Sequence, residues 1–403
     1  MLSRLDYSII IGASNKENKL GVQRKHMRGR NVLITGGAGF IGSHLAERLF
    51  EIGYKVKILD NLSPQIHGPD AKLPQHLKDK VEFIKGDVRS KVDLKRALTS
   101  INAVVHLAAE TGVGQSMYEI ARYVNTNVEG SAILLECVIE KSQVSKIILA
   151  SSRAVYGEGK YICEKCGITY PESRSQSELK RGRWHMHCAK CGRIVEPLPT
   201  DENTILRPMS IYAVTKQAQE QMFSIMAKAH KIPYSILRYF NVYGQRQSLS
   251  NPYTGILSIF SSRIVNGKPP LVYEDGLESR DFVHVSEVIK ATILALEKTE
   301  ANYEIFNVGS GRRATILEVA NLLADKLGGS LRPIVVGKYR EGDIRHCYAD
   351  LSKIKTKLGY EPSKSLEEGI SEFVEWVKHQ KNILDLSDKA SKELARRKLL
   401  REM

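Results

Sequence analysis

Thr35-Gly36-Gly37-Ala38-Gly39-Phe40-Ile41-Gly42 is the stretch that decides the fold, because its glycines stand at GxxGxxG spacing between an apolar strand and a predicted helix. Gly36 permits a tight turn, Gly39 leaves room for backbone N–H groups to approach a pyrophosphate, and Gly42 lets the helix pack close to the strand. The helix N-terminus then points its positive dipole end at the phosphates. Strand, loop and helix in this order predict a dinucleotide bound to a Rossmann-type fold.

Asp60 indicates which dinucleotide is bound. It closes the second predicted strand, 18 residues after Gly42, where a carboxylate accepts hydrogen bonds from the adenosine ribose. The alternative interpretation is that Asp60 simply starts a turn with Asn61. No Arg or Lys directly follows Asp60, so a 2′-phosphate would meet negative charge. The sequence therefore favours NAD over NADP.

Short apolar strands alternate with helices after this loop, and strands of this kind are typical of a parallel sheet buried on both faces. The predicted fold class is α/β, a doubly wound Rossmann sheet with a smaller C-terminal substrate lobe. The expected organisation is a basic N-terminal extension (1–30), a NAD-binding Rossmann domain (31–240) interrupted by a four-cysteine zinc-ribbon-like insertion (158–200), a mainly substrate-binding lobe with returns to the sheet (241–380) and a charged helical tail (381–403).

Tyr212 and Lys216 lie four residues apart and therefore on one face of a helix predicted over residues 211–229. A phenol normally loses its proton near pH 10. An ammonium group beside it favours the phenolate, which lets such a tyrosine act as a base at neutral pH. YxxxK is a weak motif alone, and its position after five strand–helix units gives it weight.

With these features the chain resembles the extended short-chain dehydrogenase/reductase family, and within it the NAD-dependent nucleotide-sugar epimerases and dehydratases. The resemblance covers residues 30–380 apart from the cysteine-rich segment. The segments that carry it are residues 35–42, 86–88, 106–109, 151–157, 212–216, 238–244, 279–284 and 340–343.

The resemblance implies that Ser152 joins Tyr212 and Lys216 as the third catalytic residue and hydrogen-bonds the reacting sugar oxygen. The family's 4,6-dehydratases carry Asp-Glu directly after this position, for acid–base work on a second carbon. Here Arg153 and Ala154 follow, and neither exchanges protons usefully near pH 7. Epimerisation is therefore favoured over dehydration: Tyr212 takes a hydroxyl proton at C4, the C4 hydride passes to NAD, and the 4-keto intermediate turns and receives the hydride on its other face.

The resemblance also implies which residues hold the two ligands. A guanidinium suits a diphosphate because its planar fork gives two parallel hydrogen bonds. For Arg280 the alternative is a structural ion pair with Asp281. The substrate-binding residues expected are Ser116, Asn241, Arg280, Arg340 and Asp343. The cofactor-binding residues expected are Gly36, Gly39, Phe40, Ile41, Gly42, Asp60, Asn61, Asp87, Val88, Leu107, Ala108, Ala109, Asn127, Tyr212 and Lys216.

Cys163, Cys166, Cys188 and Cys191 form two CxxCG knuckles separated by 21 residues. Two such turns can converge on one tetrahedral Zn²⁺, and a closed site of four thiolates leaves no open position for chemistry, so a structural zinc is predicted. Free thiols or a redox pair are the alternative. Because the segment interrupts the chain between two predicted catalytic residues, it must loop out and return beside the active site.

The net charge of +15 lies mainly in appendages, since residues 1–30, 158–200 and 381–403 together carry eleven of these charges. A continuous basic groove is not indicated, and a nucleic-acid partner is not expected. No apolar run is long enough to span a bilayer, and no clear signal peptide is present, so a cytoplasmic protein without a membrane partner is expected.

These inferences predict an NAD-dependent nucleotide-sugar 4-epimerase, a homodimer, acting on dTDP-L-rhamnose or a related deoxysugar. A UDP-hexose or UDP-uronate 4-epimerase is the alternative within the same class. A non-catalytic NAD-sensing or nucleic-acid-binding Rossmann protein is the alternative from another class, because fold alone does not fix function.

Overall fold

The computed structural model describes residues 30–68, 71–140, 143–253 and 255–403. The N-terminal extension predicted at 1–30 therefore lies outside the described residues, apart from Arg30. Among the described residues, no helix is both long and apolar enough to cross a bilayer.

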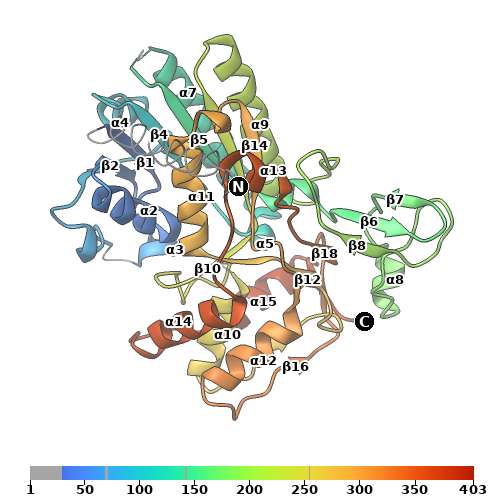
Figure 1. Cartoon of the computed structure of the whole chain (residues 1–403). Helices are drawn as coiled ribbons and strands as arrows, with labels where there is room; N and C mark the ends of the chain where they lie inside the picture. The colour runs from blue at the N-terminus through green and yellow to red at the C-terminus, as the bar shows by residue number, and fades with distance from the viewer. Residues whose placement is uncertain (1–29, 69–70, 141–142, 254) are drawn as a thin grey trace, which may run out of the picture.

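A seven-stranded sheet forms the centre of the upper half in Figure 1, and all its strand pairs are parallel. The strand order reverses on either side of β1, so the carboxyl end of this strand is the topological switch point, where open α/β sheets bind their ligands. In spatial order the strands are β14 (Glu304–Val308), β9 (Tyr234–Tyr239), β5 (Lys146–Ser152), β4 (Ala103–His106), β1 (Asn31–Thr35), β2 (Lys55–Asp60) and β3 (Glu82–Lys85).

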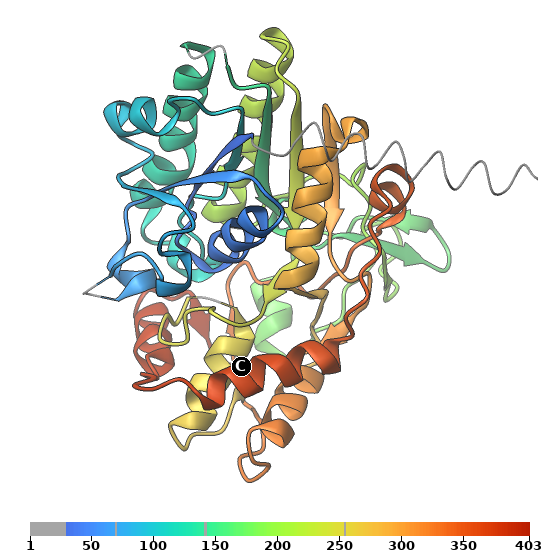
Figure 2. The ribbon, with the colours of Figure 1, turned by 60° about the vertical axis from the view of Figure 1, so that its left-hand side comes forward.

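Helices cover both faces of this sheet, as the sequence predicts for a doubly wound fold (Figures 1 and 2). Alternate residues of β1 enter two separate cores: Val32 and Ile34 join one, and Leu33 joins the other. The first core includes residues of α2 (Phe40–Glu51) and α11 (Val285–Glu297), and the second includes residues of α4 (Lys91–Ala97), α7 (Gly130–Glu140) and α9 (Ile211–Ala229).

The substrate lobe lies below the sheet in both ribbon views and has a core of its own. Its main helices are α10 (Ile256–Val265), α12 (Ile316–Lys326) and α14 (Leu366–Lys378). A short parallel pair, β10 (Asn241–Tyr243) with β13 (Phe282–His284), joins the lobe to the end of β9.

The four-cysteine insertion is a small three-stranded sheet that projects to the right in Figure 1. Its strands are β6 (Lys160–Cys163), β7 (Gly167–Thr169) and β8 (Glu196–Leu198), and β6 pairs with both of the others. Lys160 stands opposite Leu198, so the chain enters and leaves the insertion at neighbouring positions.

The C-terminal tail packs against the substrate lobe, although its charged sequence does not indicate whether it packs against the fold. Helix α15 (Ser387–Arg396) buries Ala390 and Leu394. Beyond it, β19 (Leu400–Arg401) pairs antiparallel with β17 (Tyr339–Arg340). The tail is therefore held beside a predicted substrate-binding arginine.

Candidate active site

A cleft of about 740 Å³ runs along the carboxyl ends of β1, β2, β4 and β5 and continues to the lobe at Asn241. The three predicted catalytic residues line it. All the predicted cofactor residues line it too, except Asn127: Gly36, Gly39, Phe40, Ile41, Gly42, Asp60, Asn61, Asp87, Val88, Leu107, Ala108, Ala109, Tyr212 and Lys216.

The glycine loop is packed too closely for side chains at its last position. A Cβ at Gly42 would overlap the carbonyl oxygen of Gly36, which explains why a glycine stands there. Helix α2 starts directly after Gly39, and no side chain caps its N-terminus. Its first N–H groups therefore remain available to a bound phosphate.

Asp60 makes the turn contact at the end of β2 and also faces the cleft. One carboxylate oxygen accepts the Leu62 N–H at 2.9 Å, which is the turn contact. The other accepts the Ala38 N–H at 3.0 Å and so fixes the glycine loop. His67 approaches the carboxylate to 3.6 Å. The carboxylate lines the cleft, so it is also placed to receive a ribose hydroxyl.

Ser152, Tyr212 and Lys216 come together at the centre of the cleft. Ser152 ends β5, and Ser210 caps α9 so that Tyr212 lies in its first turn. Burial raises the pKa of the Tyr212 phenol, whereas its hydrogen bond with Ser152 and the positive charge of Arg153 lower it, and burial prevails.

Lys216 lies beneath the tyrosine. Its Nζ is 5.9 Å from the centre of the Tyr212 ring and donates to the Ala150 carbonyl at 2.9 Å. Burial lowers the pKa of Lys216 to about 8, which places this group close to its titration range at neutral pH.

A buried ion pair holds α9 in place one turn beyond Lys216. Arg238 of β9 donates two hydrogen bonds to Glu220, at 2.7 and 2.9 Å, and the Ser151 hydroxyl donates to the same carboxylate at 2.5 Å. The pair ties α9 to the two strands behind it, and bidentate geometry fixes its orientation.

Asn127 and Ser116 do not reach the cleft. The Asn127 amide accepts the Glu110 N–H at 2.8 Å and donates to the Thr215 hydroxyl at 3.0 Å. Ser116 is fully buried, and its hydroxyl donates to the Val113 carbonyl at 2.7 Å. This geometry does not support the predictions that they contact cofactor and substrate, because their hydrogen-bonding groups are occupied inside the protein. Asn127 instead positions α9 from behind.

Both terminal nitrogens of Arg280 also donate to protein groups. Its carboxylate partner is Asp343, at 3.0 Å, and not Asp281, so the Arg280–Asp281 ion pair that was the alternative prediction does not form. Asp281 instead accepts hydrogen bonds from the loop after β14. The remaining acceptors around the Arg280 guanidinium are the carbonyl oxygens of Ser279, Ile344 and Arg345.

Arg340 and Asn241 have open positions instead. The Arg340 guanidinium lies 4.7 Å above the Tyr273 ring, and its buried Nε has no hydrogen-bond partner in the described chain. The Asn241 side-chain oxygen is likewise buried without a partner there, although it lines the cleft. Buried polar atoms without partners are costly, and a ligand in the cleft could satisfy the Asn241 oxygen, whereas Arg340 is not among the residues that line the cleft.

Arg153 is the site residue whose significance the sequence reasoning missed, because its residue type was used only to exclude dehydration. Its side chain lines the cleft next to Ser152 and contributes positive charge at Tyr212. The available signal was a cation directly after a predicted catalytic serine.

The four cysteines of the insertion meet at one point. Their Sγ atoms all lie within 4.8 Å of one another, and those of Cys163 and Cys191 are 3.5 Å apart. Zn–S bonds of about 2.3 Å in a tetrahedron place the sulfurs about 3.8 Å apart. The cluster therefore fits a zinc ion held by four thiolates, with no open position for chemistry.

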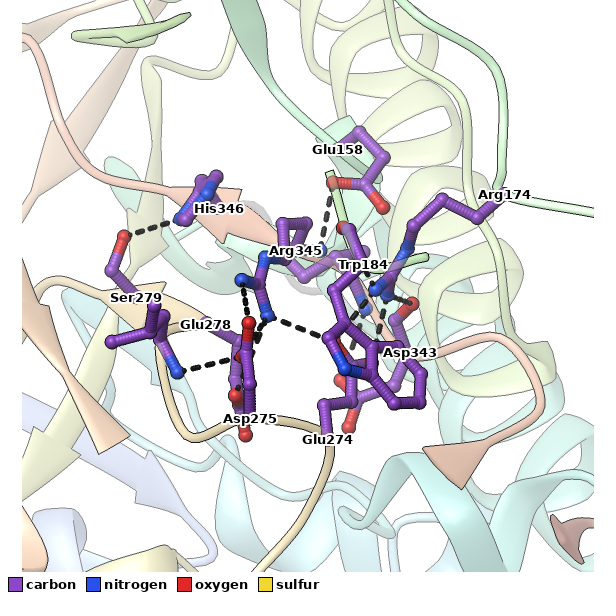
Figure 3. A network of polar contacts seen from close by, with 12 residues as sticks. Glu158, Arg174, Trp184, Glu274, Asp275, Glu278, Ser279, Asp343, Arg345 and His346 are labelled. Atoms are coloured by element: carbon purple, nitrogen blue, oxygen red, sulfur yellow. Dashed lines mark hydrogen bonds and ion pairs between the residues drawn. The ribbon is translucent and has the colours of Figure 1, made fainter. Parts of the chain in front are cut away.

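Polar contacts connect this insertion to the predicted substrate residues (Figure 3). Arg174 of the insertion donates to Glu274 at 2.6 and 2.9 Å and to the Asp343 carbonyl at 3.3 Å. Trp184 packs on Tyr339, the residue before Arg340, with the ring centres 6.2 Å apart. The insertion thus supports the loop that carries Arg340 and Asp343.

Two family models match this chain, and together they cover most of its Rossmann unit. Residues 33–173 match a family model described as GDP-mannose 4,6 dehydratase, and residues 189–309 match one described as the NAD dependent epimerase/dehydratase family. The gap between the two matches falls inside the four-cysteine insertion.

Individual relatives cover nearly the whole fold. The dTDP-L-rhamnose 4-epimerase of Burkholderia thailandensis is 39% identical over 87% of this chain and 95% of its own length. The crystal structure of UDP-glucose 4-epimerase from Thermotoga maritima with UDP-glucose is 33% identical, covers 86% of this chain and 98% of that one, and has a TM-score of 0.70. The crystal structure of UDP-glucuronic acid 4-epimerase from Bacillus cereus with UDP-glucuronic acid and NAD is 28% identical, with coverage of 86% and 99% and a TM-score of 0.71.

Proposed function

Because the chain belongs to the NAD-dependent epimerase/dehydratase family, we propose that it inverts the configuration at C4 of a nucleotide-linked sugar. The observation that carries this proposal is the meeting of Ser152, Tyr212 and Lys216 in one cleft with the glycine loop. Arg153 and Ala154 in place of an acidic pair argue against dehydration, although one matching family model is named after a dehydratase.

A bound NAD, held by the glycine loop and Asp60, would supply a reversible hydride acceptor for C4 of the sugar, so the reaction would involve no net oxidation. Tyr212 takes the proton of the C4 hydroxyl and later gives it back. Ser152 hydrogen-bonds the same oxygen, and Lys216 adds positive charge beneath the phenol. The partnerless oxygen of Asn241 accepts a donor group of the substrate.

The proposed substrate is dTDP-L-rhamnose or a related deoxysugar. Support comes from the Burkholderia thailandensis relative, whose name carries this activity. UDP-hexoses and UDP-uronates are the alternatives, because relatives with those names share the fold at lower identity.

The test is incubation of the purified protein with a panel of dTDP- and UDP-sugars, followed by NMR of the C4 proton. We expect inversion at C4 of at least one dTDP-deoxysugar without added NADH, because a cofactor that is regenerated needs no external reductant. Absence of inversion for every sugar, in protein shown to contain NAD, would contradict the proposal.

Asp60→Asn is expected to weaken NAD binding by roughly 10- to 100-fold. Hydrogen bonds to a charged group contribute about 1.5–3 kcal/mol, and the substitution removes the charge that faces both Ala38 and the ribose. NADP binding should suffer less, so the preference for NAD narrows. Titration calorimetry measures both affinities, with Asp325→Asn, at an exposed position of α12, as the control. An unchanged NAD affinity would show that Asp60 serves only the turn.

We further propose a structural zinc, a homodimer and a cytoplasmic location. The four-sulfur cluster fits the metal, and thiolate ligands persist in a reducing compartment.

Helices α7 and α9 carry exposed apolar side chains, among them Ile139, Val214 and Ile225, which a second copy of the chain would cover in a homodimer. Light scattering coupled to size-exclusion chromatography measures the oligomeric state directly.

A further inference from the structure

The C-terminal tail is fixed to the lobe by charged groups around the start of α15. Arg263 of α10 lies 2.6 Å from the Asp388 carboxylate and donates to the Ser387 hydroxyl at 2.9 Å. Lys268, just beyond α10, lies 3.1 Å from the Asp385 carboxylate and 2.8 Å from that of Asp388. The side chains of Arg263 and Asp385 are almost fully buried, so salt screens this attachment less than it would a surface pair.

The other end of α15 reaches the NAD-binding domain (Figure 1). Leu394 is buried against α5 (Val113–Ser116), where a Cβ placed on Gly114 would lie 3.5 Å from its methyl groups. The Arg397 guanidinium lies 4.3 Å from the centre of the Tyr118 ring, which follows α5. Helix α15 therefore contacts the lobe with its first residues and the NAD-binding domain with its last turn.

The two parts of the fold that α15 joins meet at the wall of the cleft. The Tyr118 hydroxyl is hydrogen-bonded to that of Tyr253 at 2.6 Å. A Cβ on Gly112, whose φ is 113°, would lie 3.0 Å from the Cβ of Tyr253, so this close approach needs a glycine. Both Gly112 and Tyr253 line the cleft. Arg397 thus contacts Tyr118, and Tyr118 in turn fixes a residue of the cleft wall.

The tail is separate from the main cores and from the NAD end of the cleft. The buried apolar residues of α15, Ala390 and Leu394, belong neither to the two cores of the sheet nor to the core of the lobe. The described partners of Asp60 all lie within the NAD-binding domain. Loosening the tail should therefore change the spacing of the cleft walls without removing a member of these cores.

We propose that Leu394 and Arg397 are positioning residues, through which the tail holds the lobe against the NAD-binding domain and sets the spacing of the cleft walls around the sugar. The proposal rests on the proposed function, because it assigns the cleft beside Tyr253 to the nucleotide sugar. Neither positioning residue needs to touch the substrate. Apparent affinity falls in proportion to the fraction of molecules whose walls are correctly spaced, so a detached tail weakens sugar binding.

The test compares Leu394→Ala with Leu384→Ala, and Arg397→Gln with Arg396→Gln. Leu384 is an exposed leucine of the tail, and Arg396 pairs with the same Glu393 carboxylate as Arg397 but is more exposed. We expect Leu394→Ala to raise the KM for the sugar at least about 10-fold and Arg397→Gln about 2- to 5-fold. The kcat and the NAD affinity should change little, because a uniform loss of binding raises KM alone. Arg397→Lys keeps a charge above the ring and should lie closer to wild type.

Hydrogen–deuterium exchange measures the same contacts without turnover. We expect faster exchange in peptides that contain Gly112 and Tyr118 in Leu394→Ala and Arg397→Gln, but not in the two controls, and no change at the glycine loop. A double-mutant cycle of Arg397→Gln with Tyr118→Leu tests the route. Once the Tyr118 ring is gone, loss of Arg397 should weaken sugar binding no further.

Calorimetry on NAD-loaded protein, with dTDP-L-rhamnose and UDP-glucose as the probes, measures affinity, and thermal unfolding checks the fold. Unchanged exchange around Tyr118 would overturn the proposal, as would unchanged affinity for both sugars. A joint fall in kcat, sugar affinity and NAD affinity would also overturn it, because the tail would then serve stability alone. If the wild type neither binds nor inverts any sugar, the proposed function fails, and exchange alone decides whether the tail positions the cleft walls.

Discussion

Tyr212→Phe is expected to lower the rate of C4 inversion by about 10³-fold or more while NAD stays bound. The substitution removes only the phenolic oxygen, so the ring can still pack over Lys216, whose Nζ lies 5.9 Å from its centre. No other side chain of the described cleft combines a hydrogen bond to Ser152 with a titratable proton. The proton of the sugar hydroxyl then has no acceptor, and hydride transfer stops with it.

NMR of the sugar product measures the rate, and absorbance of the extracted cofactor measures bound NAD. Tyr303→Phe, at an exposed tyrosine after α11, is the matched control and should behave like wild type. Activity retained in Tyr212→Phe would remove the basis of the proposed mechanism. Loss of NAD together with activity would point instead to a damaged fold. A purely NAD-sensing protein would show no inversion even in the wild type.

Cys163→Ser is expected to release the metal from the insertion, lower thermal stability and weaken substrate binding without weakening NAD binding. The core of the insertion has only five buried members, Tyr161, Cys163, Met186, Cys188 and Val195. So small a core depends on its metal, whose binding free energy in zinc-finger peptides is about 10–16 kcal/mol. Arg174 and Trp184 then lose their positions beside Asp343 and Tyr339.

Metal analysis, thermal unfolding and calorimetry with dTDP and NAD measure these effects separately. Cys137→Ser, at a buried cysteine of α7 outside the insertion, is the control. Arg174→Gln should keep the metal but still weaken dTDP binding, because it cuts the contacts to Glu274, Asp343 and the Trp184 carbonyl without changing a cysteine. Full folding and activity of Cys163→Ser with no bound metal would defeat the zinc proposal.

Local sequence patterns predict this fold well because they reflect constraints that act over short distances. A side chain at Gly42 would overlap the carbonyl oxygen of Gly36, so a glycine is required where the helix packs against the loop. Both residues lie in the eight-residue stretch 35–42, so this requirement can be read from the local sequence. The helix over Ile211–Ala229 has an N-terminal serine cap and the predicted bounds. The Cys-x-x-Cys spacing likewise fixes each knuckle locally, so the meeting of four sulfurs follows from two similar turns.

Contacts between distant residues account for what the sequence does not reveal. The sequence predicts that Asn127 contacts the cofactor, but its side-chain amide donates to Thr215, a partner 88 residues away that only the folded chain brings near. Arg280 binds a carboxylate 63 residues away instead of its neighbour Asp281. The charged tail has no apolar pattern that predicts strand β19. This strand forms through its pairing with β17, which lies about 60 residues earlier in the sequence.

The pairing of Lys160 with Leu198 has a consequence for chain entropy. Ser152 and Tyr212 are 60 residues apart, but once β6 and β8 pair, only about 22 residues of free chain separate them. Loop-closure entropy grows as about (3/2)RT ln n, so bringing the two residues together then costs about 1 kcal/mol less than it would across an unstructured insertion. The insertion therefore behaves as a self-closing module, and a chimera that grafts it into a relative at these two positions should leave the assembly of the catalytic pair intact.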